Sequence, residues 1–292
     1  MLFSLNTMIE FLAIVLFAAL LWLIPPYYQR LRRYYLRSRP LSSEQLQLLA
    51  QWLPLYRYLP AEQKRELQGN MALFLHEKAF VGCEGLLVTE AMRVAVAAHA
   101  CLLLLGRENR CYPDLYTVLL YPTTYVAREI HREGYIETTA HSVREGEAHY
   151  RGPVVLSWGD LEDDILHPEN GRNVALHEFA HKIDEEDGAY DGRPLRVENG
   201  RRWSEVFGDE FEKLRRRLKH EETIADQQGA APVLDLYGAE SPAEFFAVAT
   251  EAFFVIPHEM RAAHPQLYRE LSSFYRVDPA ALLPSHGFNT SV

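Results

Sequence analysis

The sequence predicts an α+β fold that is mainly helical, carries a small sheet, and is preceded by one N-terminal transmembrane helix. Two short runs rich in β-branched and aromatic residues lie before residue 160, which favours a small early sheet. Helical patterns dominate from Asn173 to the end of the chain. A long apolar run lies near the N-terminus. With 292 residues, 48% of them hydrophobic and 24% charged, the chain has ample material for a buried core.

The apolar run extends from Phe11 to Ile24 without interruption. A spanning helix needs about 20 residues, a length reached by counting from Leu2 and placing Glu10 near an interface. A secretory signal peptide would carry basic residues before its apolar core, whereas here the arginines follow it. By the positive-inside rule we expect residues 1–26 to be a single-pass anchor in the inner (cytoplasmic) membrane, with the body in the cytoplasm. The alternative is a cytoplasmic protein whose first helix is buried or peripheral.

The rest of the chain is predicted to be a basic juxtamembrane segment with a helix, residues 27–54, followed by one domain, residues 55–292. Residues 1–40 hold five arginines and one acid, so the remaining chain is more acidic than the net charge of −10 indicates. An acidic body without a basic stripe argues against direct nucleic acid binding. The membrane is therefore an expected partner and nucleic acid is not.

Three segments before the expected sheet have helical patterns, at residues 43–52, 61–78 and 88–106. Ser42 and Gln45 stand in a capping-box relation at the start of the first helix. The third segment is nearly all apolar and stops at Gly106, so we expect it to cross the core. Residues 115–122 and 152–158 are predicted strands, and the polar segments between them suggest hairpin or loop connections.

A His-Glu-x-x-His pattern stands at residues 177–181. Two imidazoles four residues apart lie on one face of a helix, so His177 and His181 could share a metal ion. Glu178 lies beside them and would accept a proton from a water molecule at that ion. A chance match in a chain of this composition has a probability of roughly a few per cent, so the neighbouring residues must separate a metal site from an ordinary helix.

Residues close to the pattern exclude one class of zinc site and argue against another. The metzincin pattern requires Gly at position 184 and His at position 187, but this chain has Asp184 and Asp187. A structural zinc site is usually closed by four ligands, commonly cysteines, and no cysteine lies near. Asp184 shares the face of His177 and His181, so it either accepts a hydrogen bond from an imidazole or begins a surface acidic run.

The third ligand of a catalytic zinc is sought in residues 234–254. Glu244 follows Ser241 by three residues and could instead close a capping box there. Glu251 lies seven residues later in an apolar stretch and needs a partner for its charge. Spacing alone leaves Glu244, Glu251 and Asp235 open as candidates.

Four motifs in the same order resemble the Mlc titration factor A family of zinc-dependent peptidases: "FVGCEGLLVTEAMRVAVAAHACLLLLG", "GPVVLSW", "HEFAHKID" and "YGAESPAEFFAVATEAFF". The active-site pieces are also similar to lethal-factor-type proteases, gluzincins in which a second helix supplies a glutamate. The resemblance implies a zincin-like metalloprotease domain that binds Zn2+ through His177, His181 and Glu244. It further implies that Glu178 is the general base and that Tyr237 helps to stabilise the oxyanion.

The expected function is therefore that of a zinc metallopeptidase acting on a peptide or protein substrate, with aminopeptidase and endopeptidase action both open. The resemblance also implies an alternative, a regulatory protein that sequesters a transcriptional repressor in sugar-uptake regulation. A complete set of catalytic groups favours the peptidase, because a protein that only binds a partner has no need of Glu178. The N-terminal anchor departs from the soluble founding members of the family.

Overall fold

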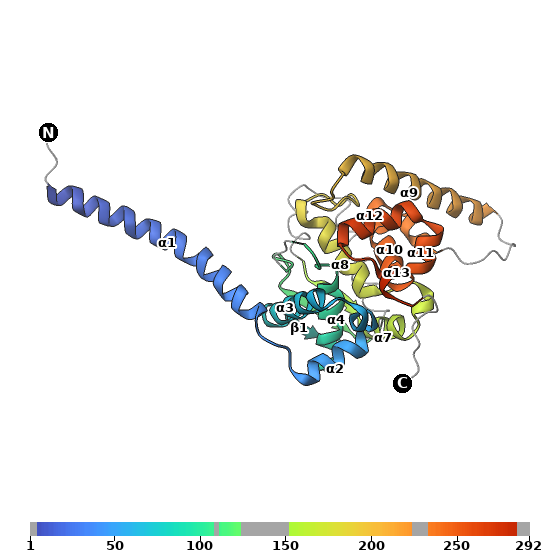
Figure 1. Cartoon of the computed structure of the whole chain (residues 1–292), viewed down its shortest axis with the longest axis horizontal. Coiled ribbons are helices and arrows are strands. Elements are labelled where there is room, and N and C mark those ends of the chain that lie inside the picture. Colours follow the sequence, from blue (N-terminus) through green and yellow to red (C-terminus); the bar gives the residue numbers. More distant parts are fainter. Residues whose placement is uncertain (1–4, 108–110, 124–151, 224–232, 285–292) are drawn as a thin grey trace.

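A computed structural model of the chain describes residues 5–107, 111–123, 152–223 and 233–284, and its architecture is drawn in Figure 1. The expected α+β class is confirmed in its coarse form, because the described chain is mainly helical with a small sheet. The α-helices are α1 (Leu5–Arg37), α2 (Ser43–Trp52), α3 (Ala61–Glu77), α4 (Glu90–Leu102), α7 (Trp158–Leu166), α8 (Val174–Asp184), α9 (Gly200–Thr223), α10 (Pro242–Val255), α11 (Pro257–Ala263), α12 (Pro265–Tyr275) and α13 (Pro279–Leu282). The strands are β1 (Ala79–Gly82), β2 (Thr117–Tyr121) and β3 (Val154–Ser157). The 3-10 turns are η1 (Pro54–Tyr58), η2 (Pro168–Asn170), η3 (Glu185–Asp187) and η4 (Leu236–Ala239).

Helix α1 extends away from the rest of the molecule, and only its C-terminal end reaches the body (Figure 1). There it packs on α3, and the guanidinium of Arg33 donates two hydrogen bonds to Glu77, of 3.0 and 3.1 Å. Among the helices that the structure describes, none is both long and apolar enough to cross a membrane. The transmembrane helix expected from the sequence stays a prediction.

The helical elements near the start of the body follow the sequence closely. Helix α2 begins with the predicted capping box, in which Ser42 and Gln45 exchange hydrogen bonds of 3.0 and 3.1 Å. Helix α4 starts after its cap Thr89 and is buried along most of its length. The predicted helix at 88–106 is too long, because α4 ends at Leu102 and turns lead from there to Gly106, whose φ of +63° suits glycine.

The sheet has the order β1-β2-β3, and both strand pairs are parallel. Of the two connections expected between β2 and β3, hairpin or loop, the hairpin is excluded, because a hairpin joins antiparallel strands. Between β1 and β2 the chain returns through α4, as a parallel pair requires. Sequence analysis missed β1, which has only four residues. Residues 124–151, which include the expected polar connection, lie outside the described residues.

Helix α8 packs against β3 and α4 on one side and against α10 on another (Figure 1). Its inner face is anchored by Phe179, whose ring centroid lies 5.7 Å from that of Phe74 and 5.1 Å from that of Tyr112. Phe179 is fully buried. His177 and His181 contact α10 instead. Packing of Phe179 therefore fixes which residues α8 presents to α10.

Helix α10 rests on an aromatic cluster built from the C-terminal helices. Trp203 of α9 stacks on Phe207 with centroids 3.9 Å apart, and it also contacts Phe246 of α10 and Phe274 of α12. Every residue of α10 from Ala243 to Phe254 is buried. Because such tight packing leaves little freedom of rotation, the carboxylates on α10 have defined positions.

Candidate metal centre

The side chains of the candidate site come from two capped helices, α8 and α10. Asn173 caps α8 by accepting the backbone N–H of Leu176 at 2.9 Å. Ser241 caps α10 by accepting the backbone N–H of Glu244 at 3.2 Å, and Pro242 occupies the first helical position. Each cap fixes the residue at which its helix begins.

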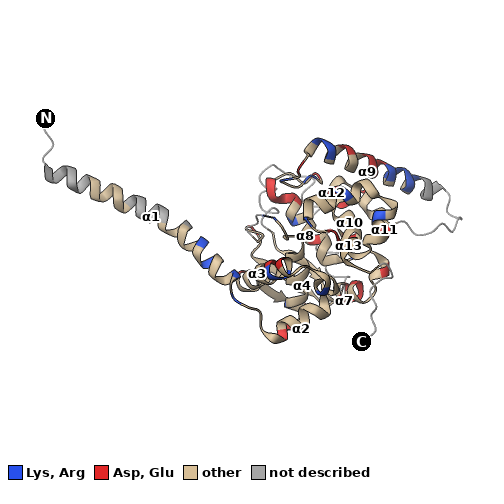
Figure 2. Ribbon diagram, viewed as in Figure 1, with Lys and Arg blue, Asp and Glu red and all other residues tan. Residues whose placement is uncertain are grey.

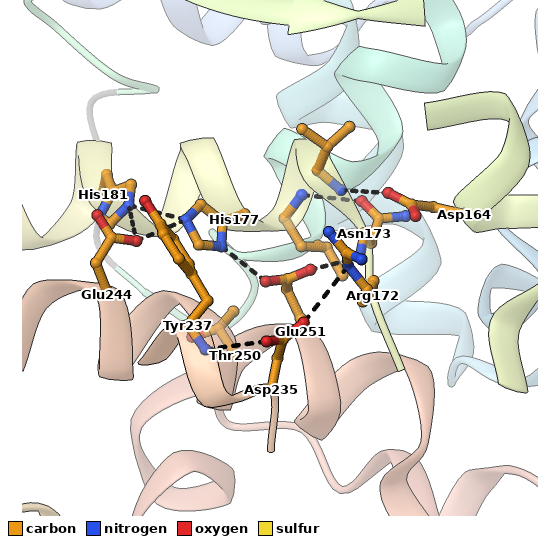
Figure 3. A network of polar contacts seen from close by, with 12 residues as sticks. Asp164, Arg172, Asn173, His177, His181, Asp235, Tyr237, Glu244, Thr250 and Glu251 are labelled. Atoms are coloured by element: carbon orange, nitrogen blue, oxygen red, sulfur yellow. Dashed lines mark hydrogen bonds and ion pairs between the residues drawn. The ribbon is translucent and has the colours of Figure 1, made fainter. Parts of the chain in front are cut away.

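Figure 3 shows the side chains of His177, His181 and Glu244 converging on one point between α8 and α10. Nε2 of His177 lies 3.0 Å from Oε2 of Glu244 and 3.1 Å from Nε2 of His181. Nε2 of His181 lies 3.4 Å from the same carboxylate oxygen. Within the described ranges, these three residues form the one group of His, Cys, Asp and Glu side chains close enough to hold a metal ion together.

The three atoms fit a zinc ion in their spacing and in their chemistry. Ligand atoms about 2.0–2.2 Å from a tetrahedral zinc lie roughly 3.3–3.6 Å from one another, close to the separations between His177, His181 and Glu244. Two imidazole nitrogens and one carboxylate oxygen form a ligand set typical of catalytic zinc. Three protein ligands leave a fourth position for water or substrate.

The charges of the side chains in the cluster favour a cation there. Burial opposes the charged form of His177, but the carboxylates of Glu251 and Glu244 outweigh it and raise its pKa well above its usual value. Burial would likewise raise the pKa of Glu244, but its contacts with His177 and His181 hold that pKa well below its usual range. The site therefore favours positive charge between the carboxylate and the imidazoles.

Glu251 stands behind His177 rather than among the converging atoms. Nδ1 of His177 donates a hydrogen bond to Oε1 of Glu251 at 2.7 Å, and the backbone N–H of Asn173 donates to its other oxygen at 2.6 Å. Since Glu251 accepts the Nδ1–H, the lone pair of His177 in its neutral form is at Nε2, on the side of Glu244 and His181. Of the three carboxylates left open by spacing, only Glu244 lies with both histidines.

Asp235, the third of those carboxylates, holds the turn that carries Tyr237. Its side chain accepts the backbone N–H of Tyr237 at 2.9 Å and lies 3.8 Å from the guanidinium of Arg172. The ring of Tyr237 lies 6.0 Å from that of His177, and the side chain is 47% exposed. Figure 3 shows Tyr237 reaching toward the cluster from η4.

Asp184 does not lie on the surface, so the alternative of a surface acidic run is wrong for this residue. The residue is fully buried, and burial raises its pKa to about 6. One oxygen accepts the backbone N–H of Gly192 at 2.8 Å, whereas the other oxygen and Nδ1 of His181 are both buried without a partner. The carboxylate that accepts a hydrogen bond from an imidazole is therefore Glu251, which binds His177. Asp184 does not do this for His181.

Two further groups complete the surroundings. Glu178 is partly buried on α8, next to His177 in sequence, and its charge favours protonation of His177. Tyr190 lies beside the other histidine, with its ring centroid 5.2 Å from that of His181. Sequence analysis missed Tyr190, because the loop that carries it shows only a turn signal, the glycines at 188 and 192.

A helix that carries two histidines one turn apart, facing a glutamate from a second helix, is an arrangement found in metallopeptidases. Comparison with known sequences agrees with this class. The family model described as Glucose-regulated metallo-peptidase M90 matches residues 28–276, and the chain belongs to this family.

The chain is similar to proteins from several bacteria along most of its length. It is 36% identical over 258 residues to the uncharacterized Synechocystis protein slr2042, covering 87% of this chain and 91% of that protein. It is 28% identical over 250 residues to proteins named Mlc titration factor A in Yersinia pestis and in Yersinia pseudotuberculosis, covering 83% of this chain and 90% of those proteins.

Proposed function

We propose that this chain is a zinc-dependent metallopeptidase that hydrolyses peptide bonds. The observation that supports it most is the convergence of His177, His181 and Glu244, whose ligand atoms all lie within 4.8 Å of one another. Membership of a metallo-peptidase family points the same way. Zinc held by these residues would supply a Lewis acid for the substrate carbonyl and would lower the pKa of a water molecule there.

The residues of the chain then perform the remaining tasks. Glu178, beside the first histidine, takes a proton from the attacking water and passes it to the leaving amine. The hydroxyl of Tyr237 donates a hydrogen bond to the oxygen that becomes negative as the carbonyl is attacked. Glu251 keeps His177 in the tautomer and orientation that ligation needs.

The proposal is tested with the full chain purified in detergent. Metal content is measured by mass spectrometry, and a mixed peptide pool is searched for cleavage products. We expect about one zinc ion per chain and cleavage that stops on chelation and returns when zinc is added. A chain that holds no metal, or that cleaves equally well after chelation, would refute the proposal. The cleaved positions would also separate aminopeptidase from endopeptidase action.

Names of the Yersinia relatives favour a second candidate function, the binding of a transcriptional repressor of the Mlc type. A pull-down with the Glu178→Gln chain and a purified repressor separates the two functions. Binding that is retained without peptide hydrolysis supports the regulatory role. Hydrolysis by the wild-type chain without any repressor binding supports the peptidase alone.

We also propose that α1 attaches the chain to the inner membrane with the body in the cytoplasm. The apolar side chains described along α1 are largely exposed, namely Leu12, Ile14, Val15, Leu16, Phe17 and Ile24. Arginines lie at the end of α1 that meets the body (Figure 2). Fractionation tests this: the full chain should stay with membranes after a carbonate wash, and a chain lacking residues 1–26 should not. Release of both chains would favour the cytoplasmic alternative.

A further inference from the structure

Each histidine of the cluster has a partly exposed tyrosine beside it. Tyr237 lies beside His177, and Tyr190 lies beside His181 with the two ring planes tilted by 42°. The side chain of Tyr190 is 39% exposed, so an aromatic surface next to the candidate metal site faces solvent. The proposed mechanism uses Tyr237 but leaves Tyr190 without a task.

The loop that carries Tyr190 is held at its start and at its end. At the start, the backbone N–H of Ala189 donates to Asp187 at 2.9 Å. At the end, the backbone N–H of Gly192 donates to the buried Asp184 at 2.8 Å, and the indole N–H of Trp203 donates to the carbonyl of Gly192 at 3.1 Å. These bonds tie the loop to α8 and to α9.

Close packing against α10 fixes the same end of the loop. Gly192 has a φ of +73°, and a Cβ added there would lie 2.3 Å from the carbonyl oxygen of Pro242. Only glycine fits this approach without a shift of the backbone. Pro242 is the first residue of α10, the helix that carries Glu244. The loop that carries Tyr190 is therefore fixed to both α8 and α10, the two helices of the candidate metal centre. Asp184 anchors this loop through its bond to Gly192.

From this geometry we propose that Tyr190 is a specificity-determining residue that forms one wall of the substrate-binding surface. Its ring takes an aromatic or large aliphatic side chain of the peptide next to the scissile bond. An aromatic face held rigidly beside the reacting groups gains contact area without ordering a flexible chain, so it favours bulky apolar side chains over glycine. The inference rests on the proposed peptidase function and names part of its substrate class.

The test compares the wild-type full chain with Tyr190→Ala and Tyr190→Phe. Cleavage sites in a peptide pool are first mapped by mass spectrometry. Two peptides are then made that differ only in Phe or Gly at the preferred position next to the scissile bond. We expect Tyr190→Ala to lower kcat/KM for the Phe peptide by about tenfold, mainly through KM, and for the Gly peptide by less than about twofold. Tyr190→Phe keeps the ring and should lower kcat/KM for the Phe peptide much less than Tyr190→Ala does.

A binding measurement gives a readout besides turnover. In the Glu178→Gln chain the labelled Phe peptide stays intact, and adding Tyr190→Ala should raise its Kd by a similar factor. Zinc content should not change. Tyr116→Ala is the matched control, because Tyr116 is an exposed tyrosine that precedes β2.

Four outcomes would overturn the inference. Equal losses of kcat/KM for both peptides, or a loss of zinc in Tyr190→Ala, would mean that Tyr190 only supports His181. A wild-type chain that cleaves peptides without preferring bulky side chains would refute the inference and leave the peptidase proposal intact. A wild-type chain that cleaves nothing in the pool would refute the peptidase proposal, and this inference with it.

Discussion

Nδ1 of His177 donates a hydrogen bond of 2.7 Å to Glu251, a carboxylate from the second helix of the candidate metal centre. The other oxygen of Glu251 accepts the backbone N–H of Asn173, the residue that caps α8. One buried side chain thus fixes both the orientation of an imidazole and the start of the helix that carries it. Glu251 is therefore a positioning residue, and Glu244 is the one that meets both histidines.

Replacing Glu251 with alanine should weaken zinc binding about 10- to 100-fold, because the Nδ1–H of His177 loses its acceptor. Glu251→Gln offers a single acceptor oxygen for two donors and should lie between alanine and wild type. Competition with a zinc-binding dye measures the affinity, and circular dichroism checks the fold. Glu259→Gln, an exposed position on α11, serves as the control. Unchanged zinc affinity in a folded Glu251→Ala chain would contradict this account.

Alanine substitutions of Glu244 and Asp235 should differ in their effect on metal content. Glu244→Ala removes one of three ligand atoms and should leave the purified chain with little zinc. Asp235→Ala should keep the metal, because Asp235 contacts the backbone of Tyr237 and the side chain of Arg172. Elemental analysis of both variants decides between them. If Asp235→Ala lost its zinc and Glu244→Ala kept it, the assignment of Glu244 as the third ligand would be wrong.

Tyr237→Phe tests the task of the phenol. The substitution removes only a hydroxyl group, so zinc content and KM should stay close to wild type while kcat falls by about 10- to 1,000-fold. Tyr116→Phe, an exposed tyrosine before β2, is the matched control. A rise in KM with unchanged kcat would show that Tyr237 binds substrate without assisting the reaction.

Several features of the site were within reach of the sequence and others were not. The four-residue spacing places His177 and His181 together, because it follows from the helical repeat alone. Spacing could not choose between Glu244 and Glu251, since seven residues separate them and both lie on one face of a helix. The choice depends on how α10 is docked against α8, which is a tertiary relationship. Tyr190 depends on the path of a loop, and no local pattern predicts that path.

The fold shows the same division. Local signals predicted α2, because Ser42 and Gln45 determine its start within a few residues. The direction of β3 relative to β2 was left open between a hairpin and a loop connection, because strand direction depends on the path of the chain between the strands. Helix α4 was predicted too long, because apolar residues continue from Leu103 to Leu105 although the helix has ended. The apolar residues from Leu103 to Leu105 indicate burial, not a continuation of the helix.

Asp164 should make stability depend on pH. It accepts the backbone N–H of Val174 at 2.8 Å, and burial raises its pKa to about 6. An acid whose folded pKa lies above its unfolded value of about 3.9 binds protons more tightly when folded. Its contribution to stability is therefore fully present below about pH 4 and is lost as pH rises through about 6.

Asp164→Asn cannot ionise and keeps an oxygen for the N–H of Val174. The free energy of unfolding of this variant, relative to wild type, should therefore increase from pH 4 to pH 7. Urea denaturation of both chains in the presence of a chelator measures the difference, and other titrating groups cancel because both chains share them. A difference that stays constant across this range would contradict the raised pKa.

The most direct test of the central claim is made at Glu178, which lies beside the ligands but outside the group of converging atoms. Metal content and peptide hydrolysis are measured for wild type, Glu178→Gln and the control Glu259→Gln. The account predicts that Glu178→Gln keeps its zinc and its fold but loses nearly all hydrolysis, because no other group takes the proton of the attacking water. Hydrolysis at the wild-type rate by a zinc-loaded Glu178→Gln chain would contradict it.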